Sequence, residues 1–391
     1  MTHSAGQSSR AATNLLLSER ATRLRRAGSF LGRGFLLLVT AASAFAVLFI
    51  FIFIIKESMP FFSKGAGGLT FNWAHFRQFF TGLGWYPTHE PAEFGAVAIF
   101  FGSAMVTLGA VIVAVPLGIL GAICLSDILP FGVRQVVKPV TEVLAAIPSV
   151  AYGFFALVVF APMLQERGGT VLAAAVWMVG LPMGGVLVFV CADLAARRFP
   201  ESSRSRAQLI VLGAAGAALL YGLARLGGHL SALRVVSGTD ALNASIILGI
   251  MALPTIVSVS EDALQAAGRE LREGSYALGA TRVETIFHVI VPAAAGGILT
   301  AVILGVMRAA GETMVVWMAS GNAAHIPTPP YNVLQPICTL TATIAGEMGE
   351  APVNSDHHQA LFSMALCLLI FSFAANVATE WISRRARRKL G

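Results

Sequence analysis

The stretch that decides the fold reads EDALQAAGRELREGSYALGATRVETIFHVIVP at residues 261–292. It is a polar, helix-prone segment between two long apolar runs. Inside it, Glu273-Gly274-Ser275 is followed by Gly279, four positions after the serine, and the stretch closes on Val289-Ile290-Val291-Pro292. An acid and two small residues, then a glycine, then a hydrophobic ending with proline form an ordered pattern, which a plain connecting loop does not need.

Leucines recur every seven residues in this stretch, at Leu264, Leu271 and Leu278, with charged residues between them. The pattern is amphipathic, but the glycines, the last of them Gly279, oppose a single continuous helix. We therefore expect two short helices joined by a glycine turn. A polar loop is usually a solvated connector, but the ordered small residues and the closing proline favour a helix that projects and docks a partner.

The composition places the rest of the chain in a membrane. Of 391 residues, 56% are hydrophobic and 12% are charged, whereas soluble domains carry about 25% charged residues. Eight stretches are each long enough to cross a bilayer as a helix, which takes about 20 residues. They are Gly34–Ile55, Phe94–Ser126, Val143–Leu164, Gly168–Ala192, Ala207–Ala224, Ala241–Ser260, Ala293–Ser320 and His358–Thr379. The prediction is an all-α integral membrane protein.

The basic residues predict the orientation. Twenty of the 27 Lys and Arg fall before residue 34, in the loops 126–141, 193–206 and 261–291, or after residue 379. Because basic residues collect on the cytoplasmic side, we expect both termini and the 261–291 loop in the cytoplasm. We expect a multi-pass protein of the cell inner membrane that contacts lipid and binds no nucleic acid.

These signals divide the chain into segments. We expect a disordered cytoplasmic tail at 1–33, a transmembrane anchor at 34–56 that is not a cleaved signal, and a periplasmic loop at 57–93. Two core parts follow at 94–164 and 241–380, the second with the 261–292 loop, and a basic tail at 381–391. The segment 165–240 lies between them and carries two helices around the basic residues 197–206.

Signatures of catalysis are absent from the sequence. It has no phosphate-binding loop of the Gly-x-x-x-x-Gly-Lys-Ser/Thr type, no Gly-x-Ser-x-Gly elbow and no His-Glu-x-x-His helix. No spacing of cysteine and histidine indicates a metal site. We expect no enzyme activity, no catalytic residue, and no metal or cofactor bound by this chain.

An acid, a proline and small residues interrupt one apolar run, at Glu142 to Gly153. Pro148 removes a backbone donor and loosens the helix. Two interpretations stay open: a kinked packing helix, or a pore-lining helix whose Ser149 hydroxyl faces a polar path beside Glu142.

Two charges lie inside the apolar run Ala293–Ser320. As one helix, this run would place Arg308 ~22 Å from its cytoplasmic end, near the bilayer centre, and the i, i+4 spacing would let it meet Glu312. A central arginine costs about 2.5–3.5 kcal/mol, so it must face protein or water. The pair is either a structural ion pair or an anion contact in a translocation path, because the guanidinium fork suits oxyanions. Glu312 would then moderate affinity and accept a proton from a protonated oxyanion, which favours phosphate over sulfate.

Two outer loops carry further signals. The loop 56–93 is rich in aromatic residues, which favours an interfacial belt or short surface helices, or a rim that docks a substrate-binding protein. The loop 321–357 contains Thr339–Met348, which we expect to be a short helix or a re-entrant segment.

Taken together, these motifs resemble a known family. The 261–292 stretch resembles the EAA loop of ABC importer permeases. The segments LAAIPSVAYG at 144–153, ALPTIVSVSEDAL at 252–264 leading into 269–286, and RAAGETMVV at 308–316 are similar to the phosphate-specific permeases of the PstC type. Thr313-Met314 favours this subunit over its sister permease. The likeness covers residues ~94–164 and ~241–380.

The resemblance implies a type I ABC importer (MetI-like) helical core. It implies one half of an inorganic phosphate pore, a heterodimer with a second phosphate permease subunit, an ATPase dimer that uses ATP and Mg, and a periplasmic or lipid-anchored phosphate-binding protein. Arg308, Glu312 and Thr313 would match the substrate path, and Glu273, Gly274, Ser275, Gly279 and Pro292 the ATPase contact.

The sequence departs from the family pattern in two places. The family has six spans, so 165–240 is interpreted as an inserted two-helix segment, by default a peripheral packing pair. Gly274 stands where the family has an alanine. This difference lowers the helix propensity at that position by about 1 kcal/mol. The remaining alternatives are an importer of another oxyanion or solute, an ATP-independent secondary transporter or channel, and a membrane scaffold for phosphate signalling.

Overall fold

The computed structural model describes residues 19–63, 71–196 and 201–390. Its elements are α2 (Glu19–Ser63), α3 (Trp73–Thr81), β1 (Trp85–Tyr86), β2 (Glu93–Phe94), α4 (Val97–Ile123), η1 (Cys124–Ile128), α5 (Phe131–Ala145), α6 (Ser149–Phe155), η2 (Ala156–Phe160), α7 (Ala161–Ala196), α8 (Glu201–Ser231), α9 (Ala241–Ala266), α10 (Arg269–Ala277), α11 (Arg282–Thr285), η3 (Ile286–Ile290), α12 (Val291–Ala310), α13 (Met314–Ala319), α14 (Leu340–Glu347) and α15 (Asp356–Leu390). The elements η1, η2 and η3 are π-helical turns.

Within these described ranges, seven helical runs are long and apolar enough to cross a membrane. They are Gly32–Ser63, Val97–Ile128, Ser149–Ala192, Gln208–Ser231, Ala241–Ala266, Arg282–Ala310 and Asp356–Ile382. The sequence predicted eight, and the difference lies in Ser149–Ala192, which joins two predicted spans. Its backbone is non-helical at Arg167 (φ −132°, ψ 24°), so two helices meet there at a kink. Both predicted spans therefore have a helical counterpart.

Three predicted boundaries were wrong. The basic loop predicted at 126–141 is mostly helix α5, and the span predicted at 143–164 is broken between α5 and α6, where Pro148 precedes the first residue of α6. The single span predicted at Ala293–Ser320 is two helices, α12 and α13, separated by Gly311–Thr313. The basic tail, for which no secondary structure was predicted, continues helix α15 as far as Leu390, so this prediction stays open.

The chain divides into two units, residues 1–57 and 58–391. The first unit contains most of α2, whose side chains from Gly32 onward are almost all exposed within that unit. Of the predicted disordered tail, residues 1–18 lie outside the described part, and residues 19–33 already belong to α2, so the prediction was wrong for them. The anchor helix predicted at 34–56 runs on to Ser63.

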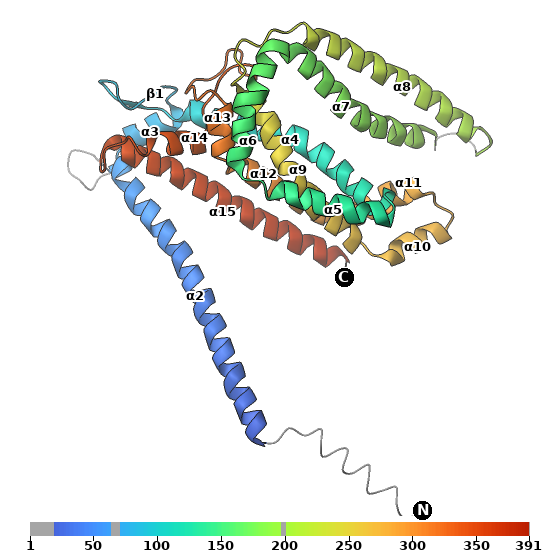
Figure 1. Cartoon of the computed structure of the whole chain (residues 1–391), viewed down its shortest axis with the longest axis horizontal. Coiled ribbons are helices and arrows are strands. Elements are labelled where there is room, and N and C mark those ends of the chain that lie inside the picture. The colour runs from blue at the N-terminus through green and yellow to red at the C-terminus, as the bar shows by residue number, and fades with distance from the viewer. Residues whose placement is uncertain (1–18, 64–70, 197–200, 391) are drawn as a thin grey trace, which may run out of the picture. The chain divides into compact units, whose positions relative to one another are not determined.

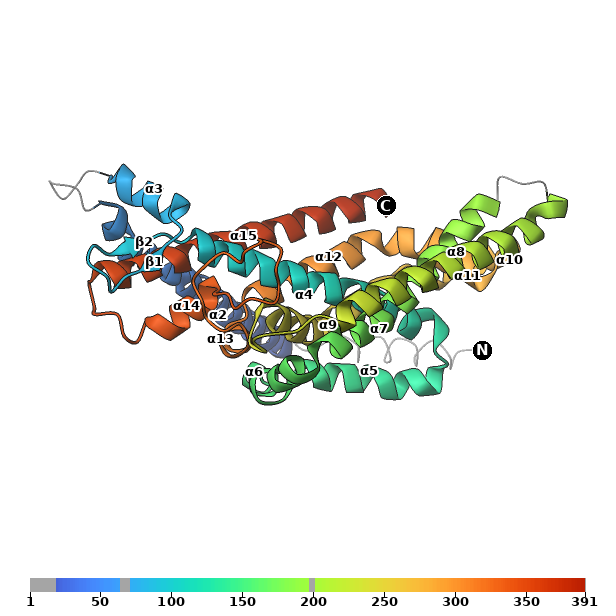
Figure 2. The same ribbon diagram turned by 90° about the horizontal axis from the view of Figure 1, so that it is seen from above.

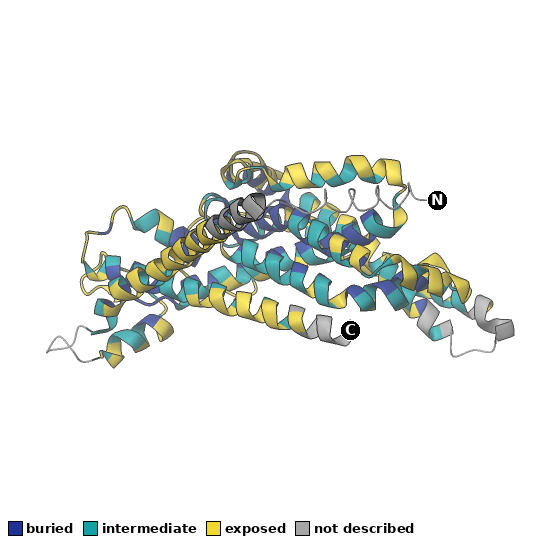
Figure 3. Cartoon of the chain, turned by 90° about the horizontal axis from the view of Figure 1, so that it is seen from below, coloured by how far each residue is buried: buried dark blue, intermediate teal, exposed yellow. Residues whose placement is uncertain are grey.

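The core of the second unit lies where α4, α9 and α12 pack together. Glycines allow the close approach, as is common between membrane helices. A Cβ at Gly118 of α4 would lie 2.6 Å from Cγ2 of Ile256 on α9, and one at Gly305 of α12 would lie 2.6 Å from Cδ1 of the same residue. Figure 3 shows the buried residues gathered in the middle of the bundle, with exposed residues along its outer helices.

The loops and short elements collect at two ends of this bundle. Figures 1 and 2 show α10, α11, the end of α4 and the C-terminus of α15 at one end, called here the α10 end. The hairpin of β1 and β2, α3, α14 and the start of α15 lie at the opposite end. The segments that the sequence assigned to one side, 126–141, 261–291 and the residues after 379, thus lie together.

The opposite end is held by aromatic residues. Phe61, Phe79, Trp85 and Phe94 are buried in one cluster, so part of the aromatic loop forms a small core. Trp85 Nε1 donates to Glu347 Oε2 at 3.0 Å, and His357 Nε2 lies 2.7 Å from the same oxygen. These bonds join β1, α14 and α15. The short helix predicted within 339–348 is confirmed as α14.

The segment 165–240 forms a hairpin of α7 and α8, which lie side by side at the edge of the bundle in both views (Figures 1 and 2). A Cβ at Gly180 of α7 would lie 2.5 Å from Cδ2 of Leu223 on α8, so the two helices touch closely. Their outward side chains are apolar and exposed, among them Met178, Leu187 and Ile210. Apolar exposure over a helix hairpin fits contact with lipid.

Candidate functional site

Of the two short helices predicted in 261–292, one is a separate helix, α10, whereas α11 continues through η3 into α12 as the helical run Arg282–Ala310. Gly279 between them has φ +85°, and Gly268 before α10 has φ +88°, a conformation that favours glycine. Thr281 then begins α11 with a capping box: its Oγ1 accepts from the Glu284 amide at 3.3 Å, and its own amide donates to Glu284 Oε2 at 2.9 Å. The glycine turn and the cap fix where each helix begins.

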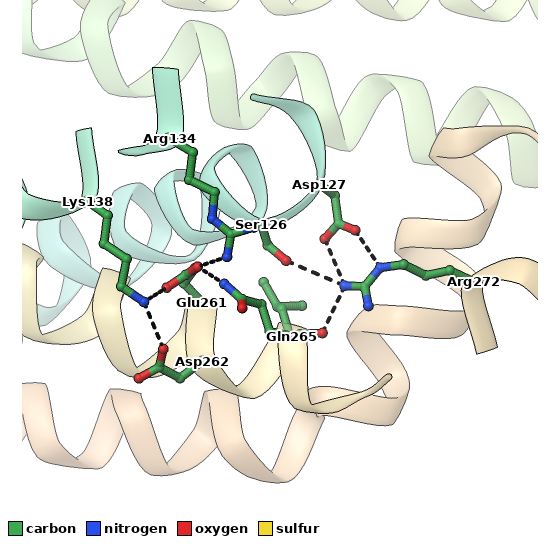
Figure 4. Close-up of polar contacts among 9 residues, drawn as sticks. Ser126, Asp127, Arg134, Lys138, Glu261, Asp262, Gln265 and Arg272 are labelled. Atoms are coloured by element: carbon green, nitrogen blue, oxygen red, sulfur yellow. Dashed lines mark hydrogen bonds and ion pairs between the residues drawn. The ribbon is translucent and has the colours of Figure 1, made fainter. Parts of the chain in front are cut away.

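Arg272 fastens α10 to the bundle (Figure 4). Its Nε donates to Asp127 Oδ1 at 2.8 Å, at the end of the α4 run, and its Nη2 donates to the Leu264 carbonyl of α9 at 2.9 Å. A further bond runs from Nη1 to the Gly268 carbonyl at 3.0 Å. One guanidinium group thus joins three elements, and its planar fork suits several fixed acceptors.

Glu261 is the centre of a second charged group, beside the first. Its carboxylate is completely buried and accepts from Arg134, from Lys138 Nζ at 2.7 Å and from Gln265. Lys138 also reaches Asp262 at 3.1 Å. The hydrogen bond to Glu261 is the largest of the effects that raise the pKa of Lys138 above its ordinary value, so the ammonium stays charged. Figure 4 shows these side chains of α5 and α9 meeting next to Arg272.

The sequence reasoning missed this network, apart from the general basic character of 126–141. Arg134 and Lys138 are four residues apart and therefore share a face of a helix. Glu261 follows directly on an apolar run, where a charge is costly unless it is paired. Both signals are present in the sequence, but the pairing joins residues more than 120 positions apart, and only the fold brings them together.

The predicted ATPase-contact residues fall into two groups. Glu273, Gly274 and Gly279 are exposed, and the Leu278 side chain beside them is 91% exposed. Ser275 instead lies half-buried, with its hydroxyl 2.9 Å from Thr285 Oγ1, so it holds α10 to α11. Pro292 is exposed at the second residue of α12. The exposed group surrounds one almost fully exposed apolar side chain, that of Leu278, on an otherwise polar helix.

The predicted pair Arg308 and Glu312 is not an i, i+4 pair on one helix. Helix α12 ends at Ala310, so Arg308 lies in its last turn and Glu312 lies in the break before α13. No ion pair joins the two side chains in the part of the chain that the structure describes. This arrangement contradicts the geometry that the sequence predicted for the pair. Nε of Arg308 is buried without a hydrogen-bond partner.

The break at Gly311–Thr313 lies against two other predicted elements. Thr341 Oγ1 of α14 donates to the Glu312 carbonyl at 2.7 Å. On the other side, a Cβ at Gly153 of α6 would lie 2.7 Å from Met318 Sδ of α13. The structure thus brings together α6, α13 and α14, and with them the segments 144–153 and 308–316 that the sequence singled out.

The remaining predicted path residues are placed differently. Ser149 is the first residue of α6 and is half-buried, and Thr313 directly precedes α13. Glu142 is exposed near the end of α5 and lines a cavity of about 580 Å³ together with Lys138 and Arg269. Glu142 therefore lies with the charged groups of α5 rather than beside α13.

Comparison with known proteins gives a consistent result. Residues 114–388 match the family profile of the binding-protein-dependent transport system inner membrane component. The chain is 33% identical over 310 residues to the probable ABC transporter permease protein YqgH of Bacillus subtilis, covering 79% of this chain and 78% of the relative. It is 29% identical over 313 residues to the phosphate transport system permease protein PstC of Mesorhizobium japonicum, covering 80% of each. It is 26% identical over 359 residues to that of Pasteurella multocida, covering 91% of this chain and 93% of the relative.

Proposed function

We propose that this chain, which belongs to the family of binding-protein-dependent transport system inner membrane components, is the permease subunit that forms half of an ATP-driven inorganic phosphate importer. That it is a multi-pass ABC transporter permease follows from the family and the seven apolar helices. Phosphate as the substrate, and the partners below, are the proposal. Two relatives with which it shares about four-fifths or more of its length are phosphate permeases.

The observation that carries the substrate assignment is Arg308. Among the described residues, the buried Nε of Arg308 has no hydrogen-bond partner, which costs free energy unless an acceptor reaches it. The side chain lies beside a helix break lined by α6, α13 and α14. An oxyanion passing this point would supply the acceptor. Glu312 in the same break would keep the affinity low enough for release.

The proposed partners are assigned to the two ends of the bundle. The exposed tip of α10, with Glu273, Gly274 and Leu278, would dock on a separate ATPase dimer, which binds ATP and Mg. A second permease subunit would complete the pore, and a phosphate-binding protein would deliver the ion at the opposite end. This arrangement requires the α10 end to face the cytoplasm, with both termini on that side of the inner membrane.

Uptake of radiolabelled phosphate tests the substrate path. Cells that lack this gene but retain its partners are complemented with wild type, Arg308→Ala, Arg308→Lys and, as a control, Arg225→Ala on the exposed face of α8. We expect Arg308→Ala to abolish uptake, Arg308→Lys to keep part of it because the charge remains, and the control to match wild type. Normal uptake by Arg308→Ala contradicts the proposed path. If wild type restores uptake of sulfate and not of phosphate, the assignment of phosphate as the substrate is contradicted, but the assignment as a permease is not.

A matched pair at Gly279 tests coupling to the ATPase. No atom lies within 4 Å of a Cβ built there, so a substitution acts only through the positive φ. Alanine in that conformation costs about 1–2 kcal/mol, whereas asparagine tolerates it. We expect Gly279→Ala to reduce phosphate-stimulated ATP hydrolysis by the assembled transporter, and Gly279→Asn to retain it. Leu278→Asp should abolish coupling without removing the chain from the membrane. Unchanged hydrolysis in Leu278→Asp contradicts docking at this tip.

A further inference from the structure

A basic cavity lies between α10, α11 and the adjoining ends of α5 and α9. Its volume is about 400 Å³, and four arginines line it: Arg134 of α5, Arg269 and Arg272 of α10, and Arg282 of α11. A single carboxylate, that of Asp127, lies among them. The lining also includes the hydroxyl groups of Ser126 and Tyr276. The cavity is therefore strongly cationic.

The acids nearby do not neutralise this charge. Asp127 is already paired with Arg272 at 2.8 Å. Among the described residues, the side chain of Arg134 bonds through its Nη2 to Glu261, which leaves its other N–H groups available to a ligand. The side chains of Arg269 and Arg282 make no hydrogen bond or ion pair in the part of the chain that the structure describes. Two of the four arginines, Arg269 and Arg282, thus line this space without an ion pair among the described residues, beside two arginines that are already paired.

The fixed groups explain why the arginines stay together. Arg272 is bound by Asp127, which lines the cavity, and by two backbone carbonyls, whereas Arg134 is bound by the buried Glu261, which is not among the lining residues (Figure 4). Like charges at close range repel. An anion among them removes the repulsion, and a phosphate group accepts paired N–H donors from guanidinium forks.

We propose that this cavity binds a phosphate group, which bridges Arg269 and Arg282 to Arg134 and fixes α10 and α11 against the bundle. The site is distinct from the break beside Arg308, and its existence does not rest on phosphate being the transported ion. The phosphate group belongs either to free inorganic phosphate or to the head group of an anionic lipid. In either case, occupancy would stiffen the pair of helices that the proposed function assigns to the ATPase.

Hydrogen–deuterium exchange of residues 266–286 tests the site in the full chain reconstituted in nanodiscs. In one arm the discs contain phosphatidylcholine, and inorganic phosphate is titrated against chloride of equal ionic strength. In the other arm the discs contain phosphatidylglycerol, and no inorganic phosphate is added. At ten times the dissociation constant, we expect exchange to slow about tenfold, because opening of the helices competes with binding.

The two arms identify the source of the phosphate group. Slowing in the first arm assigns free phosphate, and slowing only in the second assigns the lipid head group. Arg269→Gln with Arg282→Gln should remove the slowing. Because both side chains are exposed, the double variant should fold, which unchanged exchange in α4 and α9 will verify. The double variant Arg269→Lys with Arg282→Lys should keep part of the slowing of exchange, because both positive charges remain.

Two controls separate this site from the transport path. Arg77→Gln, an exposed arginine at the opposite end, should keep the slowing, and so should Arg308→Ala. The proposal is overturned if neither arm slows exchange, if the glutamine double variant still shows the slowing, or if Arg308→Ala removes it. Failure of phosphate uptake by wild type would remove the proposed substrate but would leave this result unchanged.

Discussion

Helices α8 and α9 are both long and apolar, yet they occupy opposite environments. In the most apolar stretch of α9, 61% of residues are buried within the protein, against 6% in that of α8. The two helices differ in the side chains that they present to neighbouring helices. Helix α9 carries small residues that let α4 approach, and its last turns carry Glu261, whose two cationic partners come from α5. Hydropathy selects the membrane as solvent, but packing decides which helix faces protein.

The largest expected effect of a substitution lies in α9. Glu261→Ala removes the shared partner of Arg134 and Lys138 and leaves a buried gap, so we expect a loss of about 2–3 kcal/mol in the free energy of unfolding. Denaturant titration in detergent measures it. Asp262→Ala is the control, because Asp262 is exposed and pairs only with Lys138, as a surface bridge worth about 0–1 kcal/mol. Equal losses in both variants would show that burial of Glu261 does not matter.

A matched pair of glycines compares the two helices directly. Gly249 of α9 is buried, and a Cβ there would lie 3.0 Å from Val113 Cβ of α4, whereas no atom lies within 4 Å of a Cβ at Gly213 of α8. We expect Gly249→Leu to cost about 1–3 kcal/mol by overpacking, and Gly213→Leu to stay within about 0.5 kcal/mol. Thermal unfolding of the two variants checks this. Similar melting temperatures would contradict the contrast between the helices.

The start of α9 adds a pH dependence. Asp240 caps the helix by accepting from the Asn243 amide at 2.8 Å, and burial raises the pKa of its carboxyl to about 7 from an ordinary 3.8. The folded state therefore binds more protons than the unfolded state between these values, so stability falls as pH rises from about 4 to about 7. We expect a loss of about 1–2 kcal/mol between about pH 5.5 and 7.

Asp240→Asn separates this effect from the cap itself, because asparagine caps as well as aspartate. The variant should lose the decrease in stability that wild type shows across this pH range, while keeping the fold. Unfolding titrations at several pH values compare the two chains. An unaltered pH profile in the variant would assign the dependence to another group.

The smallest expected effect is removal of the hairpin. The Leu233 carbonyl oxygen lies 2.9 Å from a Cβ built on Gly169. The chain segments that enter and leave the helical hairpin are therefore adjacent. Deletion of residues 170–231 with a short Gly-Ser linker should leave phosphate uptake and thermal unfolding near wild type. Gly180→Leu, which pushes α7 from α8 at full length, is the companion variant. Loss of phosphate uptake in the deletion variant would show that the hairpin is required for transport.

The sequence predicted the membrane class, the short helix α10 and the glycine turn after it, because these depend on local patterns of hydrophobicity and glycine. It placed α5 and the break after Ala310 wrongly. The basic residues of 126–141 indicated a loop although they lie on a helix, and the apolar run 293–320 did not show that its helix stops at Ala310. The role of Arg308 stays a prediction, although its buried Nε is a new fact that supports it.

By itself, the sequence determined that this chain crosses a membrane repeatedly, because composition and apolar runs can be read directly from it. It also showed a loop whose short-range spacing resembles that of importer permeases. Only the tertiary structure decided that Glu261 meets Arg134 and Lys138, that Arg272 joins three elements, and that α9 is buried while α8 is not. Such pairings join distant positions, and their energy depends on burial and geometry, which exist only once the helices have packed.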